Sequence, residues 1–180
     1  MALKKRQALF TEGNVPPGGV CLSSFVVLRQ GNEILVGKMT KPDVWVKRFF
    51  VGQKFAPMYA SSDKFLLPAR HLAWYESPSE AAEDVIKQQL SLKVPKGRLR
   101  MIDVQSHIRG DIKSKNQPPH WDICFVFEAR ISREFVRGIK QLPWFKELGF
   151  RKLSDLRSSD FTRGHGDVLE AAGLLKARRA

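Results

Sequence analysis

The sequence lacks the segments that place a chain in a membrane or direct it to secretion. Its 180 residues contain no apolar run that approaches the ~18 residues of a membrane-spanning helix. Lys4, Lys5 and Arg6 lie near the beginning, but no long apolar stretch or small-residue cleavage pattern follows them. We therefore expect no membrane segment, no secretory signal and a cytoplasmic protein, with a short organellar transit peptide as the less favoured alternative.

The sequence is also poor in cysteine. Cys21 and Cys124 lie far apart within apolar runs, and neither belongs to a Cys-x-x-Cys pair. The histidines likewise show no zinc-motif spacing. These patterns argue against zinc and dithiol chemistry, and they predict two reduced thiols in the core of a cytosolic protein.

Acidic residues are few relative to basic ones. The 18 Asp and Glu stand against 31 Lys and Arg, which gives a formal net charge of +13. Such a surface favours anionic partners, namely nucleotides, RNA, DNA or phosphorylated metabolites. Basicity alone does not choose among them, because many basic proteins simply carry a cationic solvated surface.

The length and the hydrophobic fraction of 43% suit one domain with a substantial core. A Pro-Pro-Gly-Gly turn at 16–19 precedes the first apolar run. We expect a basic leader over residues 1–19, a single domain over 20–176 and a basic tail over 177–180.

Local patterns predict an α/β fold. Apolar runs at 21–28 and 34–39 flank a turn signal and should form a hairpin. Further elements are expected as strands at 99–108, 121–131 and 148–153 and a helix at 167–176. Strand pairs with helices between and after them indicate a mixed sheet covered by helices. The segment 40–64 shows no clear period, and no element is predicted there.

The clearest local signal is a helix capping box at 77–80, Ser-Pro-Ser-Glu, with Pro at the first helical position. The helix should run to about Leu90. At about 100° per residue, one face is apolar and the other is charged. The apolar face carries Ala81, Ala82, Val85, Ile86, Gln89 and Leu90, and the charged face carries Glu80, Glu83, Asp84 and Lys87.

Residues 67–92, together with the order of elements, resemble the Nudix hydrolase superfamily. The box of that family is a Gly, five residues, a Glu, seven residues, then Arg-Glu-apolar-x-Glu-Glu-x-Gly-apolar. Aligned on Glu76, it places Arg70 at the first glycine and Asp84 at the arginine. The lead 118–122 into a strand also looks like family members. The resemblance implies a Nudix-like α/β/α sandwich with a mixed β-sheet.

The metal-binding positions of the box are changed in this chain. In the family, glutamates at spacing i, i+3 and i+4 hold Mg²⁺, which activates water and neutralises the diphosphate. Here the same positions carry Val85, Gln88 and Gln89, which supply no carboxylate. The resemblance therefore implies a degenerate box, with no metal, no cofactor and no catalytic residue at these positions.

A relocated metal site is an alternative, because Glu80, Glu83 and Asp84 have the same spacing. Their mean direction lies roughly 140° from that of the box positions, so they should point toward solvent. Their other interpretation is structural: Glu80 completes the cap, and acids in the first turn favour the helix dipole.

The candidate ligand contacts lie outside this helix. Trp45, Lys47 and Arg48 belong to a segment that mixes bases with aromatics, which could stack on nucleobases and neutralise phosphates. Alternatively, the segment is a loop whose aromatics fold onto the core while its bases stay solvated. Arg70 is a further candidate, and so is His165, for which a turn held by backbone hydrogen bonds is the alternative.

The sequence supports three hypotheses about function. The first is a Nudix-fold protein that binds a nucleotide or a nucleic acid, such as RNA, without efficient hydrolysis. The second is a divergent hydrolase with Glu76, Asp122 or Glu128 as ligands, in which Glu76 and Glu128 are the catalytic candidates and Mg²⁺ is the cofactor. The third is a structural subunit of a ribonucleoprotein assembly with a basic interface. The sequence leaves open whether the chain is an enzyme, and in which oligomeric state it exists.

Overall fold

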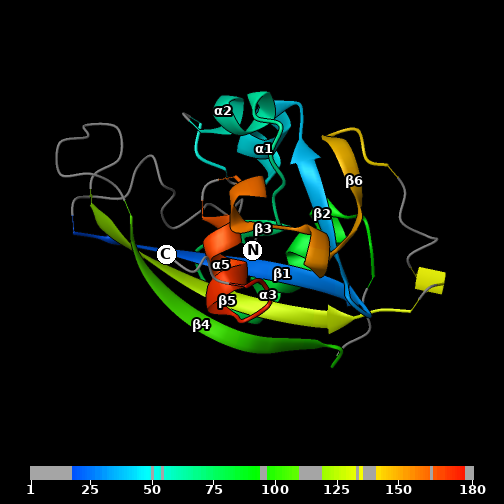
Figure 1. Cartoon of the computed structure of the whole chain (residues 1–180). Coiled ribbons are helices and arrows are strands. Elements are labelled where there is room, and N and C mark those ends of the chain that lie inside the picture. The colour runs from blue at the N-terminus through cyan, green and yellow to red at the C-terminus, as the bar shows by residue number, and fades with distance from the viewer. Residues whose placement is uncertain are drawn as a thin grey trace, which may run out of the picture.

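A six-stranded sheet in the order β4–β5–β1–β2–β6, with β3 paired to β1, forms the centre of the fold (Figure 1). The computed structural model describes residues 18–49, 51–53, 55–93, 97–109, 119–132, 134–135, 141–162 and 164–176. The strands are β1 (Val20–Gln30), β2 (Glu33–Met39), β3 (Ala69–His71), β4 (Leu99–Arg109), β5 (His120–Arg130) and β6 (Phe145–Lys152). The expected tail at 177–180 and all but the last two residues of the expected leader lie outside the described residues.

The expected hairpin of β1 and β2 is confirmed. Gln30 pairs with Glu33, so the connecting turn holds only Gly31 and Asn32. Gly31 has a positive φ of 57°, which glycine adopts without steric cost. On its other edge β1 runs parallel to β5 over its whole length, from Val20 to Arg29. The sheet is therefore mixed, as the sequence predicts.

The capping box is also confirmed. Ser77 Oγ accepts from the Glu80 amide at 3.3 Å, and Glu80 Oε2 accepts from the Ser77 amide at 2.9 Å. Helix α3 (Pro78–Asp84) begins at this box and continues as the π-helical turn η1 (Val85–Gln89). The chain thus stays helical almost to Leu90, but its second half is wound more widely than the sequence predicts.

Helices cover both faces of the sheet, which gives the α/β/α arrangement. α3 packs on the face that carries Val26 and Leu28, and α5 (His165–Ala171) packs on the face that carries Phe25 and Val27. Figure 1 shows these two helices on opposite sides of β1. Two short 3-10 turns, η2 (Leu153–Asp155) and η3 (Ser158–Asp160), lead from β6 to α5.

The segment 40–64, for which no element was predicted, contains two helices, α1 (Pro42–Phe49) and α2 (Ala56–Ser61). Both begin with Pro at an early helical position. Each spans only about two turns, and each buries only two side chains, such as Trp45 and Phe49 in α1. In α1 the exposed Lys47 and Arg48 stand between the two buried side chains, and α2 offers only Ala56 and Tyr59 over six residues, so neither helix gives a strong apolar signal.

The last helix begins earlier and ends earlier than the sequence predicts. α5 covers 165–171 in place of 167–176, and Gly173 with φ of 69° lies just beyond its end. A glycine in this conformation is a common helix terminator. Within the described residues, no helix is long and apolar enough to cross a bilayer.

Candidate functional site

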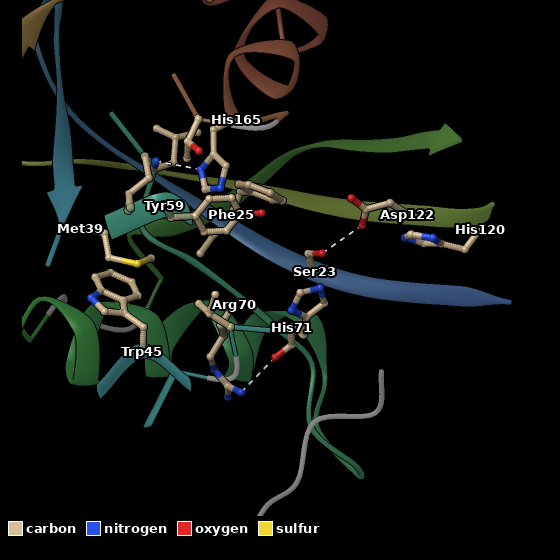
Figure 2. A pocket seen from close by; sticks show the side chains of 15 residues that line it. Ser23, Phe25, Met39, Trp45, Tyr59, Arg70, His71, His120, Asp122 and His165 are labelled. Atoms are coloured by element: carbon tan, nitrogen blue, oxygen red, sulfur yellow. Dashed lines mark hydrogen bonds between the residues drawn. The ribbon is translucent and has the colours of Figure 1, made fainter. Parts of the chain in front are cut away.

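A narrow cavity lies where β1 and β3 meet the beginning of α5, with an internal volume of about 70 Å³. Figure 2 shows an aromatic end, where Phe25 and Tyr59 lie close to Trp45. At the other end, polar side chains of β1, β3 and β5 approach one another (Figure 2). They are Ser23, His71, His120 and Asp122. One wall of the cavity can thus stack on a flat group while the other offers hydrogen bonds.

The polar end is built by strand pairing between distant parts of the chain. Asp122 Oδ1 accepts from Ser23 Oγ at 3.1 Å and from Cys21 Sγ at 3.3 Å. His71 lies directly opposite Ser23 in the β1–β3 pair. His120 is two residues before Asp122, and alternate residues of a strand face the same side. Three strands therefore bring one carboxylate, one hydroxyl and two imidazoles together.

His165 closes the cavity from the first turn of α5. Its Nδ1 accepts from the Leu67 amide at 2.9 Å, and its ring meets Phe25 edge-on at 5.1 Å between centroids. Because Nδ1 accepts, the neutral ring carries its proton on Nε2. The His165 side chain therefore fixes the junction between α5 and the segment that leads to β3. The His165 amide also donates to the Thr162 carbonyl at 3.1 Å, so the turn held by backbone hydrogen bonds, one of the two expectations from the sequence, is present.

Arg70 lines the cavity, but its guanidinium is committed to carboxylates. Arg70 Nη2 pairs with Glu76 and lies 3.3 Å from Asp84 Oδ2. Arg70 Nη1 also donates to the His71 carbonyl at 3.2 Å. Glu76 accepts a further bond from the Ala73 amide at 2.9 Å. Arg70 and Glu76 form a buried ion pair, with side chains 5% and 0% exposed.

The three box positions on the helix differ in exposure. Val85 and Gln89 are fully buried, while Gln88 is half-buried. Gln89 Nε2 donates to the Ala69 carbonyl at 2.7 Å, and Gln89 Oε1 accepts from the Ala69 amide at 3.3 Å. The amide of Gln89 thus ties the helix to the end of β3. Within the described residues, no group of three or more His, Cys, Asp or Glu side chains is arranged to hold a metal ion.

The acidic candidates do not converge. Asp122 and Glu128 lie six residues apart on β5, which corresponds to roughly 20 Å along a strand. Glu128 is buried and pairs with Arg29 at 3.5 Å and with Arg130 at 3.1 Å. Glu76 lies in the turn before α3, held by Arg70. The structure therefore brings neither Glu76 nor Glu128 to Asp122.

The three carboxylates of α3 that were considered as a relocated metal site have different surroundings. Glu80 completes the capping box, and Glu83 is exposed. Asp84 corrects the expectation that all three point toward solvent, because it reaches Arg70 and its side chain is only 25% exposed. Arg70 extends from β3 toward the helix. Residue spacing within the helix could not predict this contact, because Arg70 belongs to another element.

The basic and aromatic candidates of α1 have separate environments. Trp45 is buried, and its Nε1 donates to the Trp144 carbonyl at 3.0 Å. Lys47 and Arg48 are exposed in the last turn, and the Arg48 guanidinium lies 5.0 Å from the centre of the Trp144 ring. Of the five ligand contacts predicted from sequence, Trp45, Arg70 and His165 line one cavity, and Lys47 and Arg48 do not.

Several cavity residues were missed as site residues from the sequence. Ser23, His71 and Tyr59 are separated by long stretches of chain, and only strand pairing and helix packing unite them. The spacing of His120 and Asp122 was the one available signal, since period two places both on one face of a strand.

No family sequence model and no curated protein sequence matches the chain. Solved structures do match it. A MutT Nudix hydrolase from Burkholderia pseudomallei is 18% identical with a TM-score of 0.55, and the match covers 84% of this chain and 96% of that chain. A MutT protein from Methanosarcina mazei Go1 is 13% identical with a TM-score of 0.55, over 87% and 94%.

The Nudix domain of Shewanella oneidensis NrtR, solved in complex with ADP ribose, is 14% identical with a TM-score of 0.56. That match covers 89% of this chain and 92% of the domain. At such identities the likeness concerns the arrangement of strands and helices. From the mixed sheet, the two helical layers and these matches, we conclude that the chain has the fold of the Nudix hydrolase superfamily.

Proposed function

We propose that this Nudix-fold protein binds a nucleotide or nucleic acid at the cavity and does not hydrolyse it efficiently. The proposal rests on one observation about the helix face at which the fold family holds its metal. In this chain the side chains of that face are used for packing and for hydrogen bonds within the fold. Val85 and Gln89 are buried, and the Gln89 amide is bonded to the Ala69 backbone. These side chains stabilise the fold, and we interpret the Nudix box of this chain as degenerate.

The residues present do not fit the Mg²⁺ that the fold family implies. Mg²⁺ binds hard oxygen ligands, usually including one or two carboxylates. Val85 has no side-chain oxygen, Gln89 uses its oxygen within the fold, and Glu76 is paired with Arg70. No reaction step is therefore derived through a metal at this position.

The cavity supplies the chemistry for one end of a nucleotide. Phe25 and Tyr59 offer aromatic surface, and His71 and Asp122 offer a donor and acceptors at the far end. A volume of about 70 Å³ admits one small flat group of a ligand in this conformation. The phosphates would then lie outside, where a chain of net charge +13 attracts them.

The proposal also includes the cellular setting. Both cysteines are buried and in no disulfide, which suits a reducing compartment, so we place the protein in the cytoplasm. Its partners would be anionic ligands, and neither a membrane nor a resident cofactor is required.

Titration of the purified chain with ADP ribose, ADP and a single-stranded RNA, followed by calorimetry, tests the binding step. Product formation in the same samples with Mg²⁺ or Mn²⁺ tests hydrolysis. We expect saturable binding of at least one ligand and little or no turnover. Metal-dependent turnover that disappears in Glu76→Gln or Glu128→Gln would instead establish the divergent hydrolase, and no binding of any ligand would refute the proposed site.

A further inference from the structure

One end of the sheet exposes a group of large apolar side chains. They are Val20, Trp74, Tyr75, Val104, Ile108 and Trp121, and together they are called the apolar end surface below. Their exposed fractions range from 38% for Val20 to 100% for Tyr75. Exposed apolar residues scattered singly need no explanation, but a contiguous group marks an interaction site.

Strand pairing places four of these residues on one face. Trp121 lies opposite both Val20 of β1 and Ile108 of β4, so the three side chains form a row across three strands. Val104 lies four residues before Ile108 on β4, and its side chain faces the same side. Because side chains alternate, this face is opposite to the one that carries Asp122 and the polar end of the cavity.

The turn between β3 and α3 brings two aromatic rings to the same end. The Leu72 amide donates to the Leu22 carbonyl at 2.9 Å, which holds the following turn beside the beginning of β1. Trp74 and Tyr75 extend from this turn with their ring centres 6.4 Å apart. Tyr75 has a left-handed φ of 59°, an uncommon conformation for a bulky residue. Such strain is found where an exposed position has a role.

Helix α3 covers only the far part of this sheet face. Ser24 Oγ donates to the Pro78 carbonyl at 2.9 Å, so the helix begins above the middle of β1. Figure 1 shows β1, β4 and β5 extending beyond α3 and α5 at this end. Within the described residues, Val20, Ile108 and Trp121 belong to neither of the two buried core clusters.

The chemistry of the surface points to a second copy of the chain. None of its six side chains is charged, although the chain as a whole carries +13. Nucleic acid would require cations here to meet its phosphates. Two copies, in contrast, can approach through an uncharged patch without bringing their positive charges into contact.

The exposed area is of the size that a dimer needs. With about 150–250 Å² for each large aromatic side chain, the six residues expose on the order of 700 Å². This exceeds the few hundred Å² that a typical monomer leaves contiguous. It is close to the roughly 800 Å² per partner of a standard interface.

The edge of β4 is less suited to pairing than its face. Asp103 Oδ1 accepts from the Val104 amide at 2.9 Å, and the strand is irregular between Met101 and Asp103. A bulge and a charged side chain at a sheet edge discourage pairing with another strand. Contact through the face of the sheet remains open.

We propose that two copies of this chain pack face to face through the apolar end surface and form a twofold-symmetric dimer. Each copy contributes the same residues, as an isologous interface requires. Trp121 lies on β5, the middle strand of the patch, and Ile108 lies beside it on the edge strand β4, and these two side chains are its anchors.

Light scattering of the full chain during gel filtration tests the proposal. We expect a mass near twice the 20.5 kDa of one chain. The double variant Val104→Lys/Ile108→Lys should elute as a monomer with an unchanged circular dichroism spectrum. Met58→Lys is the matched control, because Met58 is 60% exposed on α2, outside the surface, and this variant should stay dimeric.

A cross-linking experiment covers the case in which the lysine variant fails to fold. Ser106 is exposed between Val104 and Ile108, and Ser61 is exposed on α2. A bifunctional maleimide should join Ser106→Cys chains into dimers and leave Ser61→Cys chains as monomers. A monomeric wild type, an unaffected double lysine variant, or equal cross-linking at both positions would overturn the proposal. So would a monomer whose RNA binding is lost in Trp121→Ala, which would assign the surface to nucleic acid.

Discussion

The side chain of Gln89 forms both hydrogen bonds of a backbone-like pair with Ala69, donating through Nε2 at 2.7 Å and accepting through Oε1 at 3.3 Å. An amide can make this pair, and a carboxylate cannot, because it has no donor. Gln89 is therefore a structural bridge between the helix and β3.

Introducing a carboxylate with Gln89→Glu should therefore destabilise the fold. The ionised side chain would lose the bond to the Ala69 carbonyl and bury an unpaired charge, at a cost of about 1–3 kcal/mol or more. Urea denaturation measures the loss in free energy of unfolding. Gln88→Glu is the control, since Gln88 is half-buried and should change stability little. Equal stability of the two variants would contradict this interpretation.

Arg70→Met should be one of the most damaging single substitutions. It leaves Glu76 as a buried carboxylate without its cation, which typically costs about 3–5 kcal/mol. The double variant Arg70→Met/Glu76→Gln should recover a substantial part of this loss, because the unpaired charge is then gone. Chemical denaturation of the two single variants and the double variant measures the coupling. Additive losses would show that the two residues act independently.

Cys21 and Cys124 should react slowly with a thiol reagent in the native protein. Both side chains are fully buried, and Cys21 also donates to Asp122. Labelling should become rapid in denaturant, which serves as the control for reagent and thiol competence. Rapid labelling of both thiols under native conditions would disprove their burial.

The cluster around Asp63 predicts a pH effect of known sign. The hydrogen bond from Lys38, followed by that from Lys146, lowers the pKa of Asp63, and the bond to Asp63 raises the pKa of Lys38. The Asp63 contribution to stability is therefore complete above its ordinary pKa of about 3.9 and is lost as the pH falls through the lower folded value. The Lys38 contribution is complete below about 10.4 and is lost as the pH rises through its raised folded value.

Carboxyl NMR during acid titration measures this shift directly, and in Lys38→Met the Asp63 signal should move back toward its ordinary midpoint. Because Asp63 is largely exposed, the effect on overall stability should be small. An Asp63 midpoint that is already ordinary in the wild type would contradict the assignment.

Replacing Lys47 and Arg48 together by Ala should weaken binding of single-stranded RNA and flatten its salt dependence. If each cation meets one phosphate, the slope of log K against log salt should fall by about 1.4 in magnitude. Lys152→Ala/Arg157→Ala removes two exposed cations elsewhere and serves as the matched control. An unchanged slope in the first variant would assign Lys47 and Arg48 to the solvated surface.

The sequence predicted the elements whose signals are local. The capping box at Ser77 and the turn at Gly31 each lie within a few residues, and both appear in the structure as expected. The helices α1 and α2 were missed because each is short and buries only two side chains. Local signals therefore predicted the frame of the fold but not its short covering helices.

The candidate site could be predicted less well from the sequence than the fold, because its contacts join residues that are far apart along the chain. Ser23 and Asp122 are 99 residues apart, and Leu67 and His165 are 98 residues apart. Arg70 was selected from the box alignment, yet its partners Glu76 and Asp84 become evident only when β3 and α3 are placed side by side. Spacing along the chain carries no information about such pairs.

The π-helical turn at Val85–Gln89 has a consequence for comparing this chain with its structural neighbours. A π-helical turn contains about one more residue than an α-helical turn. Residues beyond it therefore no longer occupy the positions that they would have in a continuous α-helix. Superposition by three-dimensional position can then pair residues that differ by one from those paired by counting. The stretch from Val85 to Leu92 contains no Asp or Glu, so a shift toward the C-terminus adds no carboxylate, whereas a shift of one residue toward the N-terminus would place Asp84 at the first of the three positions.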